Sequence, residues 1–397
     1  MIKIGITKEN DKIGDVRTPL SPKQSKEIKN KTGFNVEVQG SKIRCFSDDD
    51  YMKEGIDVVN NLNKSDFIFG IKEADEKKLI KDKTYFMFSH TIKKQPHNRG
   101  LLQKVLQKKI RLIDYECLKK EGKRIVAFGK YAGIAGAYNT LMAYGGKIKL
   151  FNLKRLSHFK NKKELYLFSK KNPVIKKIRS LIIGNGRVAK GVIELLNSFG
   201  FNNVTIEEYK KDLEKGPVYC ILKTKDYIEN ISGNKFSKAD YYKNPEKYKS
   251  NFLQLIDKTD MLINASYWDP RYPRLFEEKN VDNNFSIKVI GDITCDINGS
   301  IPLTKFASTI KKPFFDYCIK SRKIIKPFSK GKTVTMMTID NLPSELPRDS
   351  SNYFGRILMK YLIPFLKERG NKIINRATIA EKGSLTKRYE YLRDYIS

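Results

Sequence analysis

The chain is poor in the residues that build disulfide frameworks, metal sites and membrane spans. Its 397 residues include only five cysteines, three histidines and one tryptophan, and no two cysteines form a CxxC pair. An odd set of unpaired cysteines argues against a disulfide framework or a structural zinc site, so we expect no bound metal. No stretch approaches the roughly 18 uncharged apolar residues of a membrane helix, so we expect no membrane partner.

The N-terminus also lacks the apolar segment and small-residue cleavage site of a signal peptide. We therefore expect a cytoplasmic protein. The oligomeric state is not readable from the sequence.

Acidic residues are scarce relative to basic ones: 44 Asp and Glu face 78 Lys and Arg, which gives a net charge of +34. Such a charge invites a nucleic-acid partner. The cations are mostly lysines spread along the chain, and the densest run, Lys154 to Lys177, lies in an expected connector. We therefore expect no nucleic-acid partner, and a basic, non-catalytic nucleic-acid binder is the alternative from a different functional class.

Strand and helix patterns alternate along two stretches of the chain. Over about the first 130 residues the alternation predicts a parallel sheet with covering helices. The pattern restarts at Ser180 with the apolar run SLIIGNGRVAKGVIELLNSFG. A polar insertion is expected from about Lys210 to Lys258, and its part rich in Lys, Tyr and Asn, KADYYKNPEKYKSNFLQLI, is expected to form a helical lobe. A final amphipathic helix follows at YFGRILMKYLIPFLKERG.

A glycine turn lies between a buried strand and an apolar helix. Gly184, Gly186 and Ala189 form the pattern GxGxxA, with Arg187 and Val188 in its variable positions. The glycines permit a tight turn and let backbone amides approach a pyrophosphate at the N-terminus of the helix. The pattern therefore predicts a dinucleotide site, with an ordinary tight turn as the alternative.

An acidic pair, Glu207 and Glu208, follows about 20 residues later, at the expected end of the next strand. A carboxylate there would bind the ribose hydroxyls of NAD, which favours NAD slightly over NADP. Lys210 and Lys211 stand nearby and leave NADP open, and surface glutamates are the alternative interpretation of the acidic pair.

Nine segments of the chain resemble the lysine–2-oxoglutarate reductase and lysine-forming saccharopine dehydrogenase family, within the alanine dehydrogenase group. They occur in the family's order and cover most of the chain. They are VRTPLSP (16–22), FGIKEAD (69–75), MFSHTIKKQ (87–95), RLIDYECL (111–118), RIVAFGKYAGIAGA (124–137), LINASYWDPRYPRLF (262–276), GDITCDINGSI (291–301), TIDNLPSELPRDSS (338–351) and KGSLTKRYEYLRDYI (382–396).

The resemblance implies an α/β fold with two Rossmann-like domains and a cleft between them, and C-terminal helices that return to the first domain. The expected substrate and catalytic domain is 1–132 with 350–397, and the dinucleotide-binding domain is 133–349. The implied reaction interconverts saccharopine with lysine and 2-oxoglutarate through an imine, with hydride exchange to NAD or NADP. A dehydrogenase for another amino or imino acid is the alternative within the same group.

The resemblance also implies which two residues act as acid and base. Lys72 and His90, each after an expected strand, match the family's acid–base pair. Arg17 is expected to bind a substrate carboxylate because its guanidinium forms paired hydrogen bonds. The other residues expected to bind substrate are Lys93, Arg124, Glu73 and Glu116. The loops expected to line the nicotinamide contain Asp292, Asp296, Asp340, Asn341 and Leu342. Surface ion pairs and helix caps are the alternatives for these residues.

Overall fold

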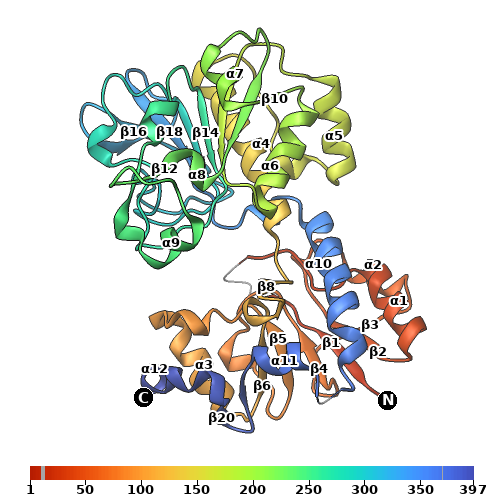
Figure 1. The fold of residues 1–397 in the computed structure, drawn as a ribbon. Helices are drawn as coiled ribbons and strands as arrows, with labels where there is room; N and C mark the ends of the chain where they lie inside the picture. Colours follow the sequence, from red (N-terminus) through yellow and green to blue (C-terminus); the bar gives the residue numbers. More distant parts are fainter. Residues whose placement is uncertain (10–13, 369) are drawn as a thin grey trace. The chain divides into compact units, whose positions relative to one another are not determined.

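The computed structural model describes residues 1–9, 14–368 and 370–397. The chain divides into two compact units, Met1–Phe128 with Pro347–Ser397 (unit 1) and Gly129–Leu346 (unit 2) (Figure 1). The sequence placed these boundaries at 132/133 and 349/350. The structure places them at the first residues of two helices, α4 (Gly129–Ile148) and α10 (Pro347–Tyr361).

The sheet of unit 1 has six parallel strands in the order 3-2-1-4-5-6 and two antiparallel strands beyond β6. The parallel strands are β1 (Lys3–Ile6), β2 (Asn35–Gln39), β3 (Asp57–Val59), β4 (Phe67–Phe69), β5 (Thr84–Met87) and β6 (Arg111–Asp114). The antiparallel pair, β19 (Thr378–Glu381) and β20 (Ser384–Leu385), comes from the C-terminal segment. The C-terminal return therefore brings strands as well as the expected helices. The strand order reverses between β1 and β4, where such sheets bind ligands.

Both faces of this sheet are buried. Phe69 and Phe86, on neighbouring strands, stack with ring centroids 4.4 Å apart on one face. Ile68 and Tyr85 pack on the opposite face, as the two-residue period of a strand requires. Figure 1 shows α1 (Pro22–Thr32), α2 (Asp48–Met52) and α10 grouped together, while α3 (Arg99–Gln107) contacts α12 (Arg393–Ile396). Helix α1 begins after its N-cap, Ser21, and ends at Gly33 with φ 69°.

The sheet of unit 2 also has eight strands, in the order β10-β11-β9-β14-β15-β18-β16-β17. The first six are parallel: β10 (Asn202–Val204), β11 (Val218–Leu222), β9 (Arg179–Ile183), β14 (Met261–Asn264), β15 (Val289–Asp292) and β18 (Thr333–Met337). The last two, β16 (Phe314–Cys318) and β17 (Lys323–Ile325), are antiparallel. The two sheets confirm the predicted α/β class. None of the described helices has both the length and the apolar character of a membrane span.

The prediction of a polar insertion from about Lys210 to Lys258 is wrong in its first part, and the helical lobe expected at KADYYKNPEKYKSNFLQLI contains a strand as well as helical turns. The first part contains β11, a largely buried strand hydrogen-bonded to β9 in the middle of the sheet. The remainder forms short elements: α8 (Thr224–Tyr227), α9 (Lys238–Lys243) and the hairpin of β12 (Ile228–Asn230) with β13 (Tyr248–Ser250). Aromatic residues from these elements, including Tyr241 and Tyr248, join the core of unit 2.

Helix α4 crosses α6 (Arg187–Ser198) with backbone against backbone. A Cβ atom on Gly133 would overlap the carbonyl oxygen of Val188 and lie 3.0 Å from Cα of Gly191. A Cβ atom on Gly191 would in turn overlap the carbonyl oxygen of Lys130. Only glycine fits at both positions, and this close contact holds the first turn of α6 in place. Figure 1 shows the two helices side by side.

Candidate functional site

In unit 1 the loops after β4 and β5 carry the two residues expected to act as acid and base. Lys72 follows β4 (Phe67–Phe69), and His90 follows β5 (Thr84–Met87). These strands are parallel neighbours, so their carboxyl ends lie at one edge of the sheet. Both side chains are half-buried, which leaves them accessible while screening them in part from solvent.

The residue after Lys72 binds the imidazole of His90. Glu73 Oε1 forms a hydrogen bond with His90 Nδ1, and both side chains are less than 20% exposed, at 19% and 17%. Burial opposes ionisation of Glu73, but the hydrogen bond from His90 holds its pKa below the ordinary value. An ionised carboxylate only accepts hydrogen bonds, so Nδ1 carries the proton and Nε2 is the nitrogen that can exchange one.

Asp114, the last residue of β6 (Arg111–Asp114), holds the turn that carries His90. Asp114 is fully buried and accepts hydrogen bonds from the backbone N–H and hydroxyl of Ser89. His90 itself has φ 52°, a left-handed conformation that is uncommon for a residue with a side chain. Such backbone strain persists only where surrounding contacts impose it, and it is concentrated at functional sites.

Arg17 is buried instead of projecting from its loop. Its Nε and Nη2 atoms both bind the carboxylate of Asp15, and its guanidinium lies 4.2 Å from the centroid of the Phe128 ring. Burial opposes ionisation of Asp15, but the Arg17 guanidinium lowers its pKa to about 2. A substrate carboxylate at this position would therefore share Arg17 with Asp15.

Lys93, Glu116 and Arg124 form one charged cluster. Glu116 Oε1 lies 3.5 Å from the Lys93 ammonium and 3.3 Å from Arg124 Nη1. Glu116 Oε2 is buried and has no hydrogen-bond partner among the described residues. The cluster contains two cations and one carboxylate oxygen that can still accept a donor. Arg124 belongs to a short hairpin, β7 (Lys119–Lys120) and β8 (Lys123–Arg124).

In unit 2 the glycine turn joins β9 to α6 where the strand order reverses, between β11 and β14. Gly184 has φ 98°, and a Cβ atom there would lie 3.0 Å from the carbonyl oxygen of Ala265. A Cβ atom on Gly186 would meet nothing within 4 Å. Gly184 therefore makes the turn possible, and Gly186 leaves open space at the N-terminus of a 12-residue helix. This geometry fits a pyrophosphate.

The residues after Gly186 begin this helix. Arg187 is the first residue of α6 and is exposed. Val188 packs against Gly129 of α4, because a Cβ atom on Gly129 would lie 3.3 Å from Cγ2 of Val188. The side chain of Val188 therefore faces α4, and any cofactor contact at this position would involve its backbone.

The predicted location of Glu207 and Glu208 is wrong. Strand β10 ends at Val204, and both glutamates lie in the first turn of α7 (Ile206–Lys211). Glu208 accepts the backbone N–H of Thr205 at 2.8 Å in a helix capping box. In the part of the chain that the structure describes, strand β10 pairs only with β11, so it lies one strand away from β9 and its glycine turn. The strands that pair with β9 are β11 and β14, and Lys223 and Thr224 follow the carboxyl end of β11.

The five residues of unit 2 that are expected to line the nicotinamide differ in burial. Asp292 is fully buried and accepts hydrogen bonds from Asn264, Thr294 and Thr304, while burial raises its pKa. Leu342 is also buried, and its side chain packs near Gly136 on α4. The other three residues keep exposed surface: Asp296, Asp340 and Asn341.

Three buried carboxylates of unit 1 were missed in the sequence. Asp15 pairs with Arg17, Asp114 holds the turn of His90, and Glu9 accepts backbone N–H groups from the loop of Lys72. Asp114 carries a sequence signal, because it is a charged residue that ends an apolar strand. The partners of Glu9 lie more than 60 positions away, so its spacing in the sequence carries no signal.

Comparison with known proteins confirms the resemblance inferred from the sequence. Residues 5–135 match the family described as alanine dehydrogenase/PNT, N-terminal domain. The chain is 29% identical to the mitochondrial alpha-aminoadipic semialdehyde synthase of Bos taurus, over 98% of this chain and 47% of that protein. It is 25% identical to the NAD(+), L-lysine-forming saccharopine dehydrogenase of Emericella nidulans, over 91% of both chains. The chain thus spans about half the length of the first of these relatives.

A solved structure supports the fold. An L-alanine dehydrogenase matches with a TM-score of 0.62 over the full length of both chains, at 14% sequence identity. At that identity the likeness concerns the fold alone. The chain is therefore similar over nearly its whole length to saccharopine dehydrogenase and alpha-aminoadipic semialdehyde synthase, and it has the fold of alanine dehydrogenase.

Proposed function

We propose that this protein is a nicotinamide-dependent oxidoreductase that interconverts saccharopine with lysine and 2-oxoglutarate. The observation that carries the proposal is the Glu73–His90 pair next to Lys72, at the carboxyl ends of neighbouring strands. The relatives that match 91% to 98% of the chain include lysine-forming saccharopine dehydrogenases and alpha-aminoadipic semialdehyde synthases.

The reaction requires two kinds of step. In the oxidative direction, the carbon next to the secondary amine of saccharopine loses a hydride and the nitrogen loses a proton, which leaves an imine. Water then adds to the imine carbon, and the carbon–nitrogen bond breaks to give lysine and 2-oxoglutarate. A bound nicotinamide supplies the acceptor for the hydride. The protein must supply groups that move protons at the nitrogen and at the water.

The half-buried groups of unit 1 suit these roles. Lys72 takes the proton from the secondary amine. His90 exchanges a proton with water through Nε2, because Nδ1 is bound to Glu73. Glu73 keeps the imidazole in this tautomer and stabilises its protonated form, as a carboxylate does for a histidine base.

The charged groups around the pair suit a substrate that carries several carboxylates and ammonium groups. Lys93, Arg124 and the guanidinium of Arg17 supply positive charge for the carboxylates. Glu116 supplies a buried carboxylate oxygen, unpartnered among the described residues, for a substrate ammonium. A site for a single small amino acid would need fewer charges, which favours saccharopine over the alternative substrates of the group.

In unit 2 the N-terminus of α6, with Gly184, Gly186 and Arg187, would bind the pyrophosphate of the cofactor. Asp292 would support the loop after β15 through its three side-chain donors, while the more exposed Asp296, Asp340 and Asn341 would face the nicotinamide side.

The argument for NAD from Glu207 and Glu208 loses its basis, because neither residue follows a strand that pairs with β9. Lys223 does follow such a strand, β11, and is exposed. A cation there, together with Arg187, would favour the 2′-phosphate of NADP. We therefore propose that the site accepts NADP.

The test is steady-state turnover of saccharopine with NAD and NADP, and of lysine plus 2-oxoglutarate with each reduced cofactor. We expect Lys72→Met and His90→Gln each to lower kcat by about 10²- to 10⁴-fold, the usual contribution of a general acid or base. Matched controls are Lys77→Met and His97→Gln, because both of these residues are exposed. Near-wild-type turnover in both site variants would show that the roles are misassigned. A folded wild-type protein that consumes no saccharopine with either cofactor would refute the proposed function.

A further inference from the structure

Glu9 follows β1 (Lys3–Ile6) and is a buried carboxylate, only 6% exposed. Its two oxygens accept hydrogen bonds from two consecutive backbone N–H groups of the loop after β4 (Phe67–Phe69). Oε1 accepts from Ile71 at 2.7 Å, and Oε2 accepts from Lys72 at 2.8 Å. The carboxylate therefore binds the peptide unit that carries Lys72.

The contact between Glu9 and the loop of Lys72 lies just beyond the last backbone hydrogen bond between β1 and β4. The N–H of Thr7 donates to the carbonyl of Phe69, and the chains then diverge as loops. Gly70 lets the β1 loop approach, because a Cβ atom there would lie 3.0 Å from Thr7 Cγ2 and 3.6 Å from Glu9 Oε1. Glu9 thus joins the two loops at the point where the strand order reverses.

Burying an ionised carboxylate to hold a loop costs free energy, because the charged group must leave water. Two N–H groups aimed at two separate oxygens recover part of this cost, since hydrogen bonds to a charged acceptor are roughly twice as strong as neutral ones. A glutamine at this position would offer one acceptor oxygen, and its amide nitrogen would face an N–H donor. The pair of hydrogen bonds therefore depends on the carboxylate.

We propose that Glu9 is a positioning residue for Lys72. The carboxylate of Glu9 holds the peptide of Lys72, so that the Lys72 amine stays beside the Glu73–His90 pair. This inference rests on the proposed function, because it assigns Glu9 to the same site. Glu9 does not itself touch the reacting atoms.

The contact also gives the site a dependence on pH. Burial, together with the nearby negative charge of Asp15, raises the pKa of Glu9 to about 8. Protonation removes one of the two acceptor oxygens, so the loop of Lys72 loosens as the pH falls through this value. Among the described residues, the titratable or charged groups that face Glu9 are Asp15, Arg17, Lys72 and Tyr115.

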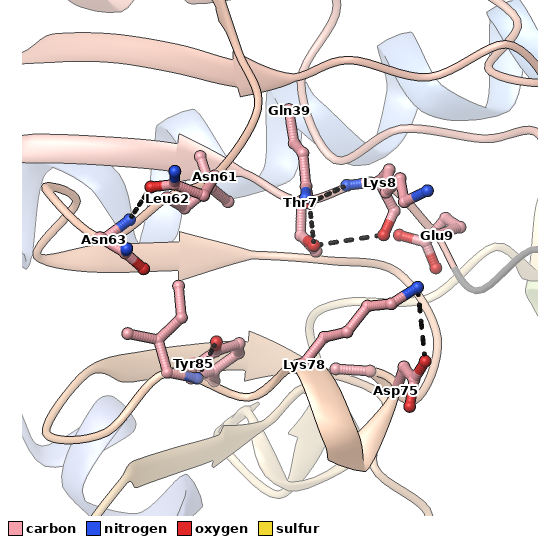
Figure 2. Close-up of a pocket in the computed structure, with 12 residues that line it drawn as sticks. Thr7, Lys8, Glu9, Gln39, Asn61, Leu62, Asn63, Asp75, Lys78 and Tyr85 are labelled. Atoms are coloured by element: carbon pink, nitrogen blue, oxygen red, sulfur yellow. Dashed lines mark hydrogen bonds and ion pairs between the residues drawn. The ribbon is translucent and has the colours of Figure 1, made fainter.

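Solvent can reach Glu9 to exchange this proton. Glu9 lines a cavity of about 280 Å³ together with Lys8, Gln39, Asp75 and Lys78. Figure 2 shows Glu9 next to Lys8 in the wall of this cavity. Residues 60–66 join β3 to β4 directly, with no helix between the two strands. The cavity lies over this part of the sheet.

The experiment compares the full-length wild type with Glu9→Gln by amide hydrogen exchange and by kinetics. We expect faster exchange at Ile71 and Lys72 in the variant. Because a displacement of about 1 Å can cost 10²-fold, we expect kcat to fall by about 10- to 100-fold above pH 8. The KM for the cofactor should not change, since the proposed pyrophosphate site belongs to unit 2 and Glu9 to unit 1. The loss of kcat in wild type as the pH falls through about 8 should be absent from Glu9→Gln.

The matched control is Glu37→Gln, because Glu37 is also buried in this sheet and accepts hydrogen bonds, but from Ser65 and Lys3. It should lower stability without changing exchange at Ile71 and Lys72 or the pH profile. If Glu9→Gln does not fold, Glu9→Asp keeps the charge with a shorter reach, and it should show a lower kcat with the pH dependence retained. Unchanged exchange and an unchanged pH profile would overturn the proposal. A wild type inactive on saccharopine would refute the proposed function, and the exchange result alone would then decide whether Glu9 holds the loop.

Discussion

The contact between α4 and α6 gives a quantitative prediction for Gly133→Ala. The added methyl would overlap the carbonyl oxygen of Val188, and the nearest atoms all belong to the backbone of α6. No side chain can rotate away, so the two helices must separate. Overpacking of this kind costs about 1–3 kcal/mol, at the upper end when the backbone must shift. The better helix propensity of alanine returns about 1 kcal/mol.

The expected net loss is about 1–2 kcal/mol, and the measurement can be confined to unit 2. A loss of 1 kcal/mol lowers the Tm of a unit of 150–250 residues by about 2–4 °C, so we expect a decrease of roughly 2–8 °C. Trp268 is the single tryptophan of the chain and lies in unit 2, so its fluorescence reports the unfolding of that unit. Thermal unfolding followed by this signal is the assay.

Gly146→Ala is the matched control in the same helix. A Cβ atom there would lie 2.9 Å from Cζ of Phe328, whose ring is 39% exposed and can turn into solvent. We therefore expect Gly146→Ala to unfold at or above the wild-type temperature. If Gly133→Ala unfolds no earlier than Gly146→Ala, the backbone contact between α4 and α6 is not as close as described.

Two further predictions concern Glu345 and Gly186. Burial raises the pKa of Glu345 from 4.5 to about 7, so its protonation stabilises the native state and stability falls as the pH rises through this window. At 1.36 kcal/mol per pKa unit, Glu345→Gln should gain up to about 3 kcal/mol relative to wild type between pH 5 and pH 8, measured by urea unfolding, and an equal difference at both pH values would contradict this. Gly186→Ala places a methyl in open space at a permitted φ of −81°, so the Tm should not change, but dinucleotide affinity should fall by at least about tenfold, or 1.4 kcal/mol. Calorimetric titration with NAD and NADP measures that loss, and unchanged affinity for both would place the pyrophosphate elsewhere.

The sequence predicted local features whose signals are contiguous. The glycine turn and the strands that carry Lys72 and His90 each consist of an apolar run followed by a loop, and the structure contains them at these positions. The roles of Lys72 and His90 came from the resemblance, because neither residue type nor spacing could choose Lys72 among the many lysines or His90 among the three histidines.

The features that were missed depend on pairing between distant segments. Strand β11 is a five-residue apolar run within a segment rich in charged residues, so the local pattern predicts that it belongs to a polar insertion. Its place beside β9 is set by hydrogen bonds between strands, which no local pattern records. Glu207 and Glu208 were misplaced for this reason. Likewise, the pairing of Glu9 with the peptide of Lys72 exists only once β1 and β4 are neighbours.

The discontinuity of unit 1 determines the order in which the protein can be completed on the ribosome. All of unit 2 is synthesised before Pro347, whereas β6 has no neighbour on its outer side until β19 is made. A nascent chain therefore carries an unpaired strand edge through the synthesis of more than two hundred residues. A premature stop between β6 and β19 would leave that edge permanently open, and the released fragment would be prone to aggregate through it.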